Sequence, residues 1–183
     1  FIINGPLTDR IGGRKTILIS AIGSALANFA MGLVVYSGTP DIVPWLVACY
    51  AVNMYFQSFG AVSIVKVNAA WFHLRERGTF GGIFGILISL GIYFAFDWGN
   101  LIVKNAPVEM VFFVTMTLLL ILAAIDFFMV FDTPGDTGHR DFDTGDASSG
   151  DHGPALSALA VGKRMMRNPV IVTIALIEFC SGF

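Results

Sequence analysis

Four long apolar stretches, each long enough to cross a lipid bilayer, constrain this chain more than any other feature. A helix rises 1.5 Å per residue, so about 20 residues cross a hydrocarbon layer of about 30 Å. The stretches are 16–36, 42–65, 80–103 and 107–131. Of all residues 55% are hydrophobic and 13% charged, more apolar surface than one water-soluble domain of this length can bury. We therefore expect an all-α, polytopic membrane protein.

A fifth apolar stretch begins after Asn168 with Pro169, a residue that suits the first turn of a helix. It continues to the end of the chain and is shorter than a full span. The chain also opens at Phe1, without an initiator methionine. We expect a fragment of a longer protein, whose fifth helix is truncated.

The basic residues are distributed unevenly between alternate connections. Ten of the eleven lie in connections of one side: Arg10, Arg14, Lys15, Lys66, Arg75, Arg77, Arg140, Lys163, Arg164 and Arg167. The opposite connections carry Lys104 beside acidic residues. Because Lys and Arg are retained on the cytoplasmic side, we expect the basic connections to face the cytoplasm. The expected location is the cell (inner) membrane, as a multi-pass protein.

Residues 132–168 are rich in Gly, Asp, Ser and Thr and poor in apolar residues. Such a segment buries too little surface to order itself, so we predict a flexible cytoplasmic linker. Its last part, Ala155–Arg167, has apolar and basic residues at near-helical spacing and predicts a short helix in the membrane interface. The predicted organisation is a helical bundle over 1–131, a linker over 132–168 and the start of a second bundle over 169–183.

One basic connection has an informative glycine pattern. Its residues are Gly5-Pro6-Leu7-Thr8-Asp9-Arg10-Ile11-Gly12-Gly13-Arg14-Lys15. We expect Gly5 to permit close helix approach, Asp9 to face a helix terminus or an arginine, and Gly12-Gly13 to make a tight turn. The stretch resembles the signature loop between the second and third helices of the major facilitator superfamily. The resemblance implies a partial twelve-helix fold, from the end of helix two to the start of helix seven.

In a transporter of this type, two helical halves rock around a central solute site. We expect a gate at the cytoplasmic ends of the helices, where charge pairs hold the two halves together in one state and part in the other. The candidate gating residues are Gly5, Asp9, Arg10, Gly12, Gly13, Arg14, Lys15, Arg75, Glu76 and Arg77.

Several short pieces narrow the resemblance further. They are Gln57-Ser58-Phe59-Gly60, Trp71-Phe72, Glu76-Arg77-Gly78 and Asp132-Thr133-Pro134 with Gly138. They are similar to the organophosphate:inorganic phosphate antiporters, the glycerol-3-phosphate and hexose-phosphate transporter type. That family binds phosphate through arginines of its first and seventh helices, which the chain does not show, and it has a His-Asn pair in helix five where this chain reads Leu87-Ile88-Ser89-Leu90.

Polar residues within the spans are candidates for the solute pathway: Asn53, Gln57, Lys66, Ser89, Tyr93 and Glu178. Residues four apart share one helical face, so Asn53 with Gln57, and Ser89 with Tyr93, either line a cavity or bind neighbouring helices. Lys66 either extends to the headgroups or serves the solute or the gate. Asp126, near the end of its span, is expected to pair with a loop arginine.

These patterns predict a secondary transporter of a small polar, anionic solute, with organophosphate exchange as the leading case and sugar acids or other carboxylates behind it. A transporter-derived membrane sensor is the alternative. We expect no enzyme, because no nucleophile, base and orienting group occur together, and no cofactor or metal, because the histidines have no ligand spacing. The expected partners are the solute and the lipid bilayer, without nucleic acid; no protein partner is indicated.

Overall fold

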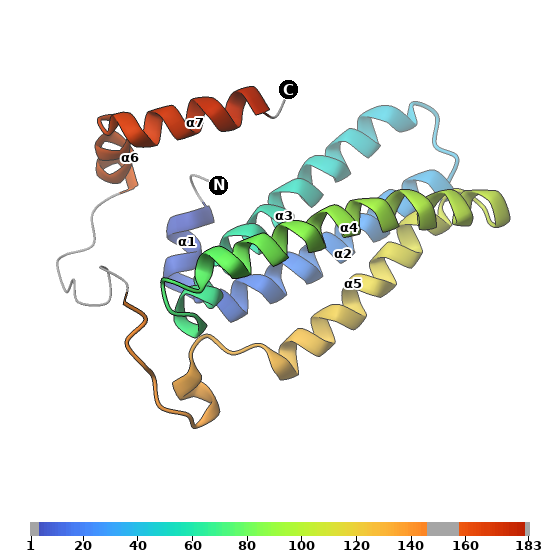
Figure 1. Ribbon diagram of the computed structural model, residues 1–183. Coiled ribbons are helices and arrows are strands. Elements are labelled where there is room, and N and C mark those ends of the chain that lie inside the picture. Colours follow the sequence, from blue (N-terminus) through green and yellow to red (C-terminus); the bar gives the residue numbers. More distant parts are fainter. Residues whose placement is uncertain (1–3, 146–157, 182–183) are drawn as a thin grey trace. The chain divides into compact units, whose positions relative to one another are not determined.

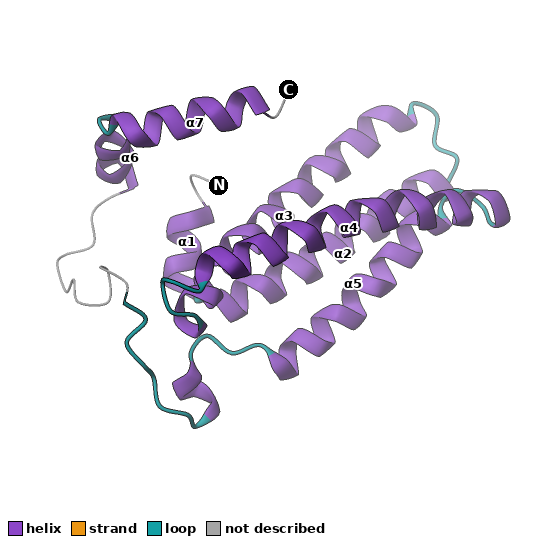
Figure 2. Ribbon diagram, viewed as in Figure 1, coloured by secondary structure: helices purple, strands orange, loops and turns teal. Residues whose placement is uncertain are grey.

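The computed structural model describes residues 4–145 and 158–181, which form two compact units (Figure 1). The first unit, 4–145, contains five α-helices and one 3-10 turn, and the second, 158–181, contains two α-helices. The described ranges contain helices and loops but no strand (Figure 2). The helical prediction is confirmed.

The first unit begins with α1 (Asn4–Ile11) and continues with four longer helices. They are α2 (Gly13–Tyr36), α3 (Ile42–Trp71), α4 (Arg77–Asn105) and α5 (Met110–Met129). Each of these four is long and apolar enough to cross a membrane, as the sequence predicts. The ends agree within a few residues, except that α3 continues six residues past the predicted end at Val65, through Lys66 to Trp71.

Helix α2 is the centre of the unit, because it packs along both α3 and α5 (Figure 1). Small residues on α2 allow this approach: a side chain at Gly23 would overlap the ring of Phe56 on α3, and a Cβ at Gly32 would lie 2.6 Å from Cε1 of Phe113 on α5. Ten residues of α2 are buried, including Ala25, Ala27 and Met31. By contrast, none of the residues of α4 is buried.

The segment after α5, the first part of the predicted linker, makes local turns and contacts with the neighbouring helices. Its 3-10 turn, Pro134–Thr137, carries a capping box between Thr133 and Asp136. Further along, the carbonyl oxygen of Thr144 accepts a hydrogen bond from the backbone of Leu74 at 2.8 Å. The segment 130–145 therefore follows the ends of α3 and α5. Its order comes from backbone hydrogen bonds and local caps, which an apolar count does not detect.

The second unit consists of α6 (Ala158–Met166) and α7 (Pro169–Ser181). Helix α6 lies within the predicted interfacial helix, whose first residues, 155–157, fall outside the described ranges. Pro169 opens α7 as expected, and the side-chain oxygen of Asn168 accepts a hydrogen bond from the backbone of Val170 at 3.0 Å. This is the N-cap arrangement that satisfies a free amide at a helix start.

Candidate gating site at the signature turn

The turn between α1 and α2 is made by Gly12, as the sequence predicts. Gly12 has φ +100°, a conformation that glycine adopts without a steric penalty, and its amide donates to the carbonyl oxygen of Thr8 at 3.0 Å. This turn reverses the chain between two helices that both contact α3. We refer to residues Thr8–Thr16 as the signature turn. The signature turn, which contains Arg14, lies at the same end of the first unit as Arg75 in the α3–α4 connection. We call this end the basic end.

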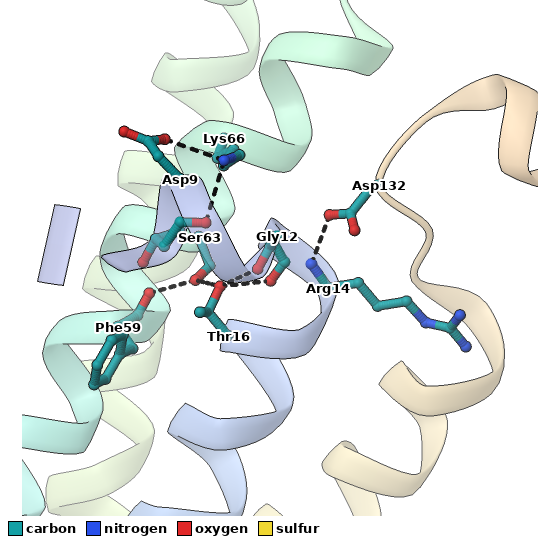
Figure 3. Close-up of polar contacts among 10 residues, drawn as sticks. Asp9, Gly12, Arg14, Thr16, Phe59, Ser63, Lys66 and Asp132 are labelled. Carbon is teal, nitrogen blue, oxygen red and sulfur yellow. Dashed lines mark hydrogen bonds and ion pairs between the residues drawn. The ribbon is translucent and has the colours of Figure 1, made fainter. Parts of the chain in front are cut away.

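A chain of hydroxyl groups fixes the signature turn to α3 (Figure 3). Ser63 Oγ on α3 donates to Thr16 Oγ1 at 2.6 Å, and Thr16 Oγ1 lies 2.7 Å from the carbonyl oxygen of Gly12. The side chains of Thr16 and Ser63 are fully buried. Sequence reasoning missed this pair, although two small hydroxyl residues in otherwise apolar spans are a signal for contact between helices.

Lys66 and Asp9 form an ion pair close to these hydroxyl groups (Figure 3). Lys66 Nζ lies 3.1 Å from Asp9 Oδ1 and 3.2 Å from the carbonyl oxygen of Thr8. Thr8 and Asp9 belong to the last turn of α1, where free carbonyls favour a cation. The side chain of Lys66 is 34% exposed and that of Asp9 is 74% exposed. The ion pair therefore contributes little to stability and can open readily.

Arg14 and Asp132 connect the signature turn to the end of α5. Asp132 Oδ1 accepts a hydrogen bond from the backbone nitrogen of Arg14 at 2.7 Å (Figure 3). The Arg14 side chain extends to α5, where Nη2 donates to the carbonyl oxygen of Phe127 at 2.5 Å. Its guanidinium carbon lies 4.7 Å from the ring centroid of Phe131 and 5.5 Å from that of Phe127. Both distances are within the range of a cation–π contact.

The connection between α3 and α4 has contacts other than those predicted for a gate. Arg77 donates from Nη2 to the carbonyl oxygen of Ala69 at 2.7 Å, and so caps the end of α3. Glu76 accepts from the backbone of His73 at 3.2 Å. Across the residues that the structure describes, no ion pair joins this connection to Asp9, whose partner is Lys66.

The remaining gating candidates take no part in the Asp9–Lys66 or Arg14–Asp132 contacts. The side chains of Arg10 and Lys15 are exposed. A Cβ at Gly5 would meet nothing within 4 Å among the described residues, so the close approach expected there is not observed. Asp126, expected to pair with a loop arginine, has no ion pair with any described residue; the nearby Arg14 bonds to the carbonyl of Phe127.

The candidate pathway residues fall into separate places. Asn53 is 3% exposed and accepts a hydrogen bond from Gln57 Nε2 at 2.7 Å, so the two side chains satisfy each other on α3. Ser89 and Tyr93 line an open pocket formed by α4 alone, and Ser89 bonds to the carbonyl of Gly85 within its own helix. The side chain of Glu178 lies outside the described residues.

Four helices long and apolar enough to cross a membrane, with α2 packed along α3 and α5, define a polytopic integral membrane protein. The chain belongs to the Major Facilitator Superfamily, whose family model matches residues 1–183. The chain is also similar to a protein described as probable nitrate/nitrite transporter NarK2 from Mycobacterium tuberculosis, in strains CDC 1551 / Oshkosh and ATCC 25618 / H37Rv.

The similarity to NarK2 covers part of each chain. The two sequences are 31% identical over 91 residues, which is 46% of this chain and 20% of the relative, in both strains. The match thus spans about a fifth of the length of these curated relatives. No solved structure matches the chain. The match of the family model over residues 1–183 is what establishes the superfamily.

Proposed function

We propose that this chain belongs to a secondary transporter that moves a small anionic solute through the membrane by alternating access. The observation that carries the proposal is the match of the superfamily model to the whole chain, together with the ion pair at the signature turn. The partial relative, described as a nitrate/nitrite transporter, supports an anionic solute. In this proposal residues 1–131 form part of the first bundle, 132–168 the central linker and 169–183 the start of the second bundle.

The Asp9–Lys66 pair suits a gate because it is weak. It joins the end of α1 to α3 within the proposed first bundle, and both side chains are partly exposed, so solvent screens the attraction. Opening of the pair would free Asp9 for the charge pairs between the two halves that the sequence predicts. Breaking such a pair costs on the order of 1 kcal/mol or less, a cost that solute binding readily offsets. We place the basic end on the cytoplasmic side of the cell (inner) membrane because of the predicted charge asymmetry.

Two solute classes lead the proposal. Nitrate or nitrite is favoured by the printed description of the partial relative. Exchange of an organophosphate for inorganic phosphate is favoured by the resemblance of Gln57–Gly60, Trp71-Phe72 and Glu76–Gly78 to that antiporter family. Sugar acids and other carboxylates follow. A membrane sensor that binds the solute without substantial flux is the second candidate function.

The test is uptake by proteoliposomes that contain the full-length protein. Isotopically labelled nitrate and labelled inorganic phosphate are supplied outside, with unlabelled nitrate, phosphate or glycerol 3-phosphate inside. Accelerated uptake of one label supports the carrier and identifies its solute class. Saturable binding of either anion without uptake supports the sensor. Uptake of a neutral sugar with no response to any anion contradicts the proposal.

A further inference from the structure

Helix α2 begins without a cap of its own. Its N-cap residue is Gly12, which has no side chain to accept a hydrogen bond from the free amides of the first turn. The amide of Arg14, the second residue of the helix, is instead satisfied by the Asp132 carboxylate at 2.7 Å. Asp132 follows the end of α5 and is 118 residues away in the sequence. It therefore supplies the missing cap from another segment and places a negative charge at the positive end of α2.

The glycine pair leaves room for this carboxylate. A Cβ at Gly13 would lie 2.9 Å from Asp132 Oδ1 and 2.6 Å from Cγ2 of Val67. A Cβ at Gly12 would lie 3.1 Å from Asp132 Oδ2, in a backbone conformation that already disfavours a side chain. A larger residue at either position would crowd the carboxylate. The pair thus serves the approach of Asp132 as well as the turn.

The contact is reciprocal. While Asp132 caps the start of α2, the Arg14 side chain bonds to the carbonyl of Phe127 in the last turn of α5, where a cation is favoured. Its guanidinium also lies over the ring of Phe131, next to Asp132. The start of α2 is therefore held to the end of α5 through the backbone amide and the side chain of one residue, Arg14.

We propose that Asp132 is a positioning residue for the Asp9–Lys66 pair, a role that rests on the gating function proposed above. The link is the carbonyl oxygen of Thr8, which accepts both from the Gly12 amide at 3.0 Å and from Lys66 Nζ at 3.2 Å. The conformation of Gly12 thus determines the position of the end of α1, including Asp9, relative to Lys66. By holding Arg14, Asp132 holds that conformation.

The first test uses hydrogen–deuterium exchange on the full-length protein in nanodiscs. We expect Asp132→Ala to speed exchange of amides 13–16 roughly fivefold, the effect of losing one cap. Gly13→Ala should do the same, because its Cβ displaces the carboxylate. Asp132→Asn should retain most of the protection, since an amide oxygen also accepts. The matched control is Asp136→Asn, whose carboxylate accepts from the backbone of Thr133 in its own turn. Unchanged exchange in Asp132→Ala overturns the proposal.

The second test measures Lys66 itself and does not require transport. Acetic anhydride labelling, followed by mass spectrometry, reports how available the Lys66 amine is. We expect faster labelling in Asp9→Asn and also in Asp132→Ala, but not in Asp136→Asn. Lys66 labelling that Asp132→Ala leaves unchanged overturns the positioning role, whether or not any anion is transported.

The third test uses uptake of labelled nitrate and of labelled inorganic phosphate by proteoliposomes that contain the full-length protein. If Asp132 acts through the Asp9–Lys66 pair, the double variant Asp9→Asn, Asp132→Ala should transport no worse than Asp9→Asn alone. Multiplied defects contradict that route. Absence of uptake of every anion by the unsubstituted protein counts against the proposed function, while the labelling result still decides the role of Asp132.

Discussion

The indole Nε1 of Trp71, at the end of α3, donates a hydrogen bond to the carbonyl oxygen of Phe131 at 3.0 Å. This bond joins the last residue of one helix to the segment that leaves another, 60 residues later in the sequence. It lies at the basic end with the Arg14–Asp132 contact, so the exit of α5 is held from two sides.

The Trp71 bond predicts a specific loss of stability. Trp71→Phe keeps an aromatic ring but removes the donor, and we expect the free energy of unfolding of the full-length protein to fall by about 1 kcal/mol. Unfolding in mixed detergent micelles with increasing SDS measures the change. The control is Trp45→Phe, because Trp45 is 59% exposed. A larger loss for Trp45→Phe than for Trp71→Phe contradicts this assignment.

The Asp9–Lys66 pair predicts rescue by charge exchange. Lys66→Met and Asp9→Asn should each reduce transport more than they reduce stability, since the partly exposed pair contributes only about 0.2–1 kcal/mol. The exchanged pair, Asp9→Lys with Lys66→Asp, should recover part of the transport rate. Initial uptake rates and SDS unfolding give the two readouts. Loss of stability well above this range in Lys66→Met would mean a structural role alone.

The contact of Gly32 with Phe113 predicts a steric defect that can be repaired. In Gly32→Ala the new Cβ would lie 2.6 Å from the Phe113 ring, and we expect a loss of about 1–3 kcal/mol from overpacking. Combining it with Phe113→Leu should restore part of the loss. Gly91→Ala on α4 is the control, because no atom of the residues that the structure describes lies within 4 Å of its Cβ position. Equal losses at Gly32 and Gly91 contradict the observed packing.

The buried hydroxyl chain predicts a cost for removing one oxygen. Thr16→Val keeps the shape but takes the acceptor away from Ser63, and we expect a loss of about 1–2 kcal/mol. Thr115→Val is the matched control, since Thr115 is exposed and bonds only to the carbonyl of Val111 in its own helix. SDS unfolding of both variants gives the comparison. A smaller loss for Thr16→Val than for Thr115→Val contradicts the role of the chain.

The sequence predicts helices well because hydrophobic length is a local property. It also predicts the turn at Gly12, because two successive glycines between basic residues indicate a tight turn, and Gly12 adopts φ +100°. The predicted apolar span ends at Val65 because a lysine follows it, but the helix itself extends further. In the structure the charge of Lys66 is satisfied by Asp9, 57 residues earlier, and the helix continues to Trp71.

Several contacts that sequence reasoning missed join distant segments, and most of them involve backbone groups. The pairing of Asp132 with the Arg14 backbone leaves no periodic pattern, because one partner is a main-chain amide. For the same reason the path of residues 132–145 was not predicted: its hydrogen bonds to Leu74 and within the capping box depend on backbone groups. Charge counting likewise left several partners possible for Asp9, and only the packing of α1 beside α3 selects Lys66.

The packing of α2 against both α3 and α5 has a consequence for the order of assembly. Helix α5 follows α4 in synthesis but packs along α2, while α4 buries none of its residues. During synthesis, we therefore expect the α2 face around Gly32 to remain in contact with lipid until α5, which carries Phe113, has been inserted. Pairing of α2 with α3 can precede this step, because those helices are neighbours in the chain. Closure by α5 is a late, long-range event, and we expect variants at the α2–α5 interface to delay maturation more than variants on α4.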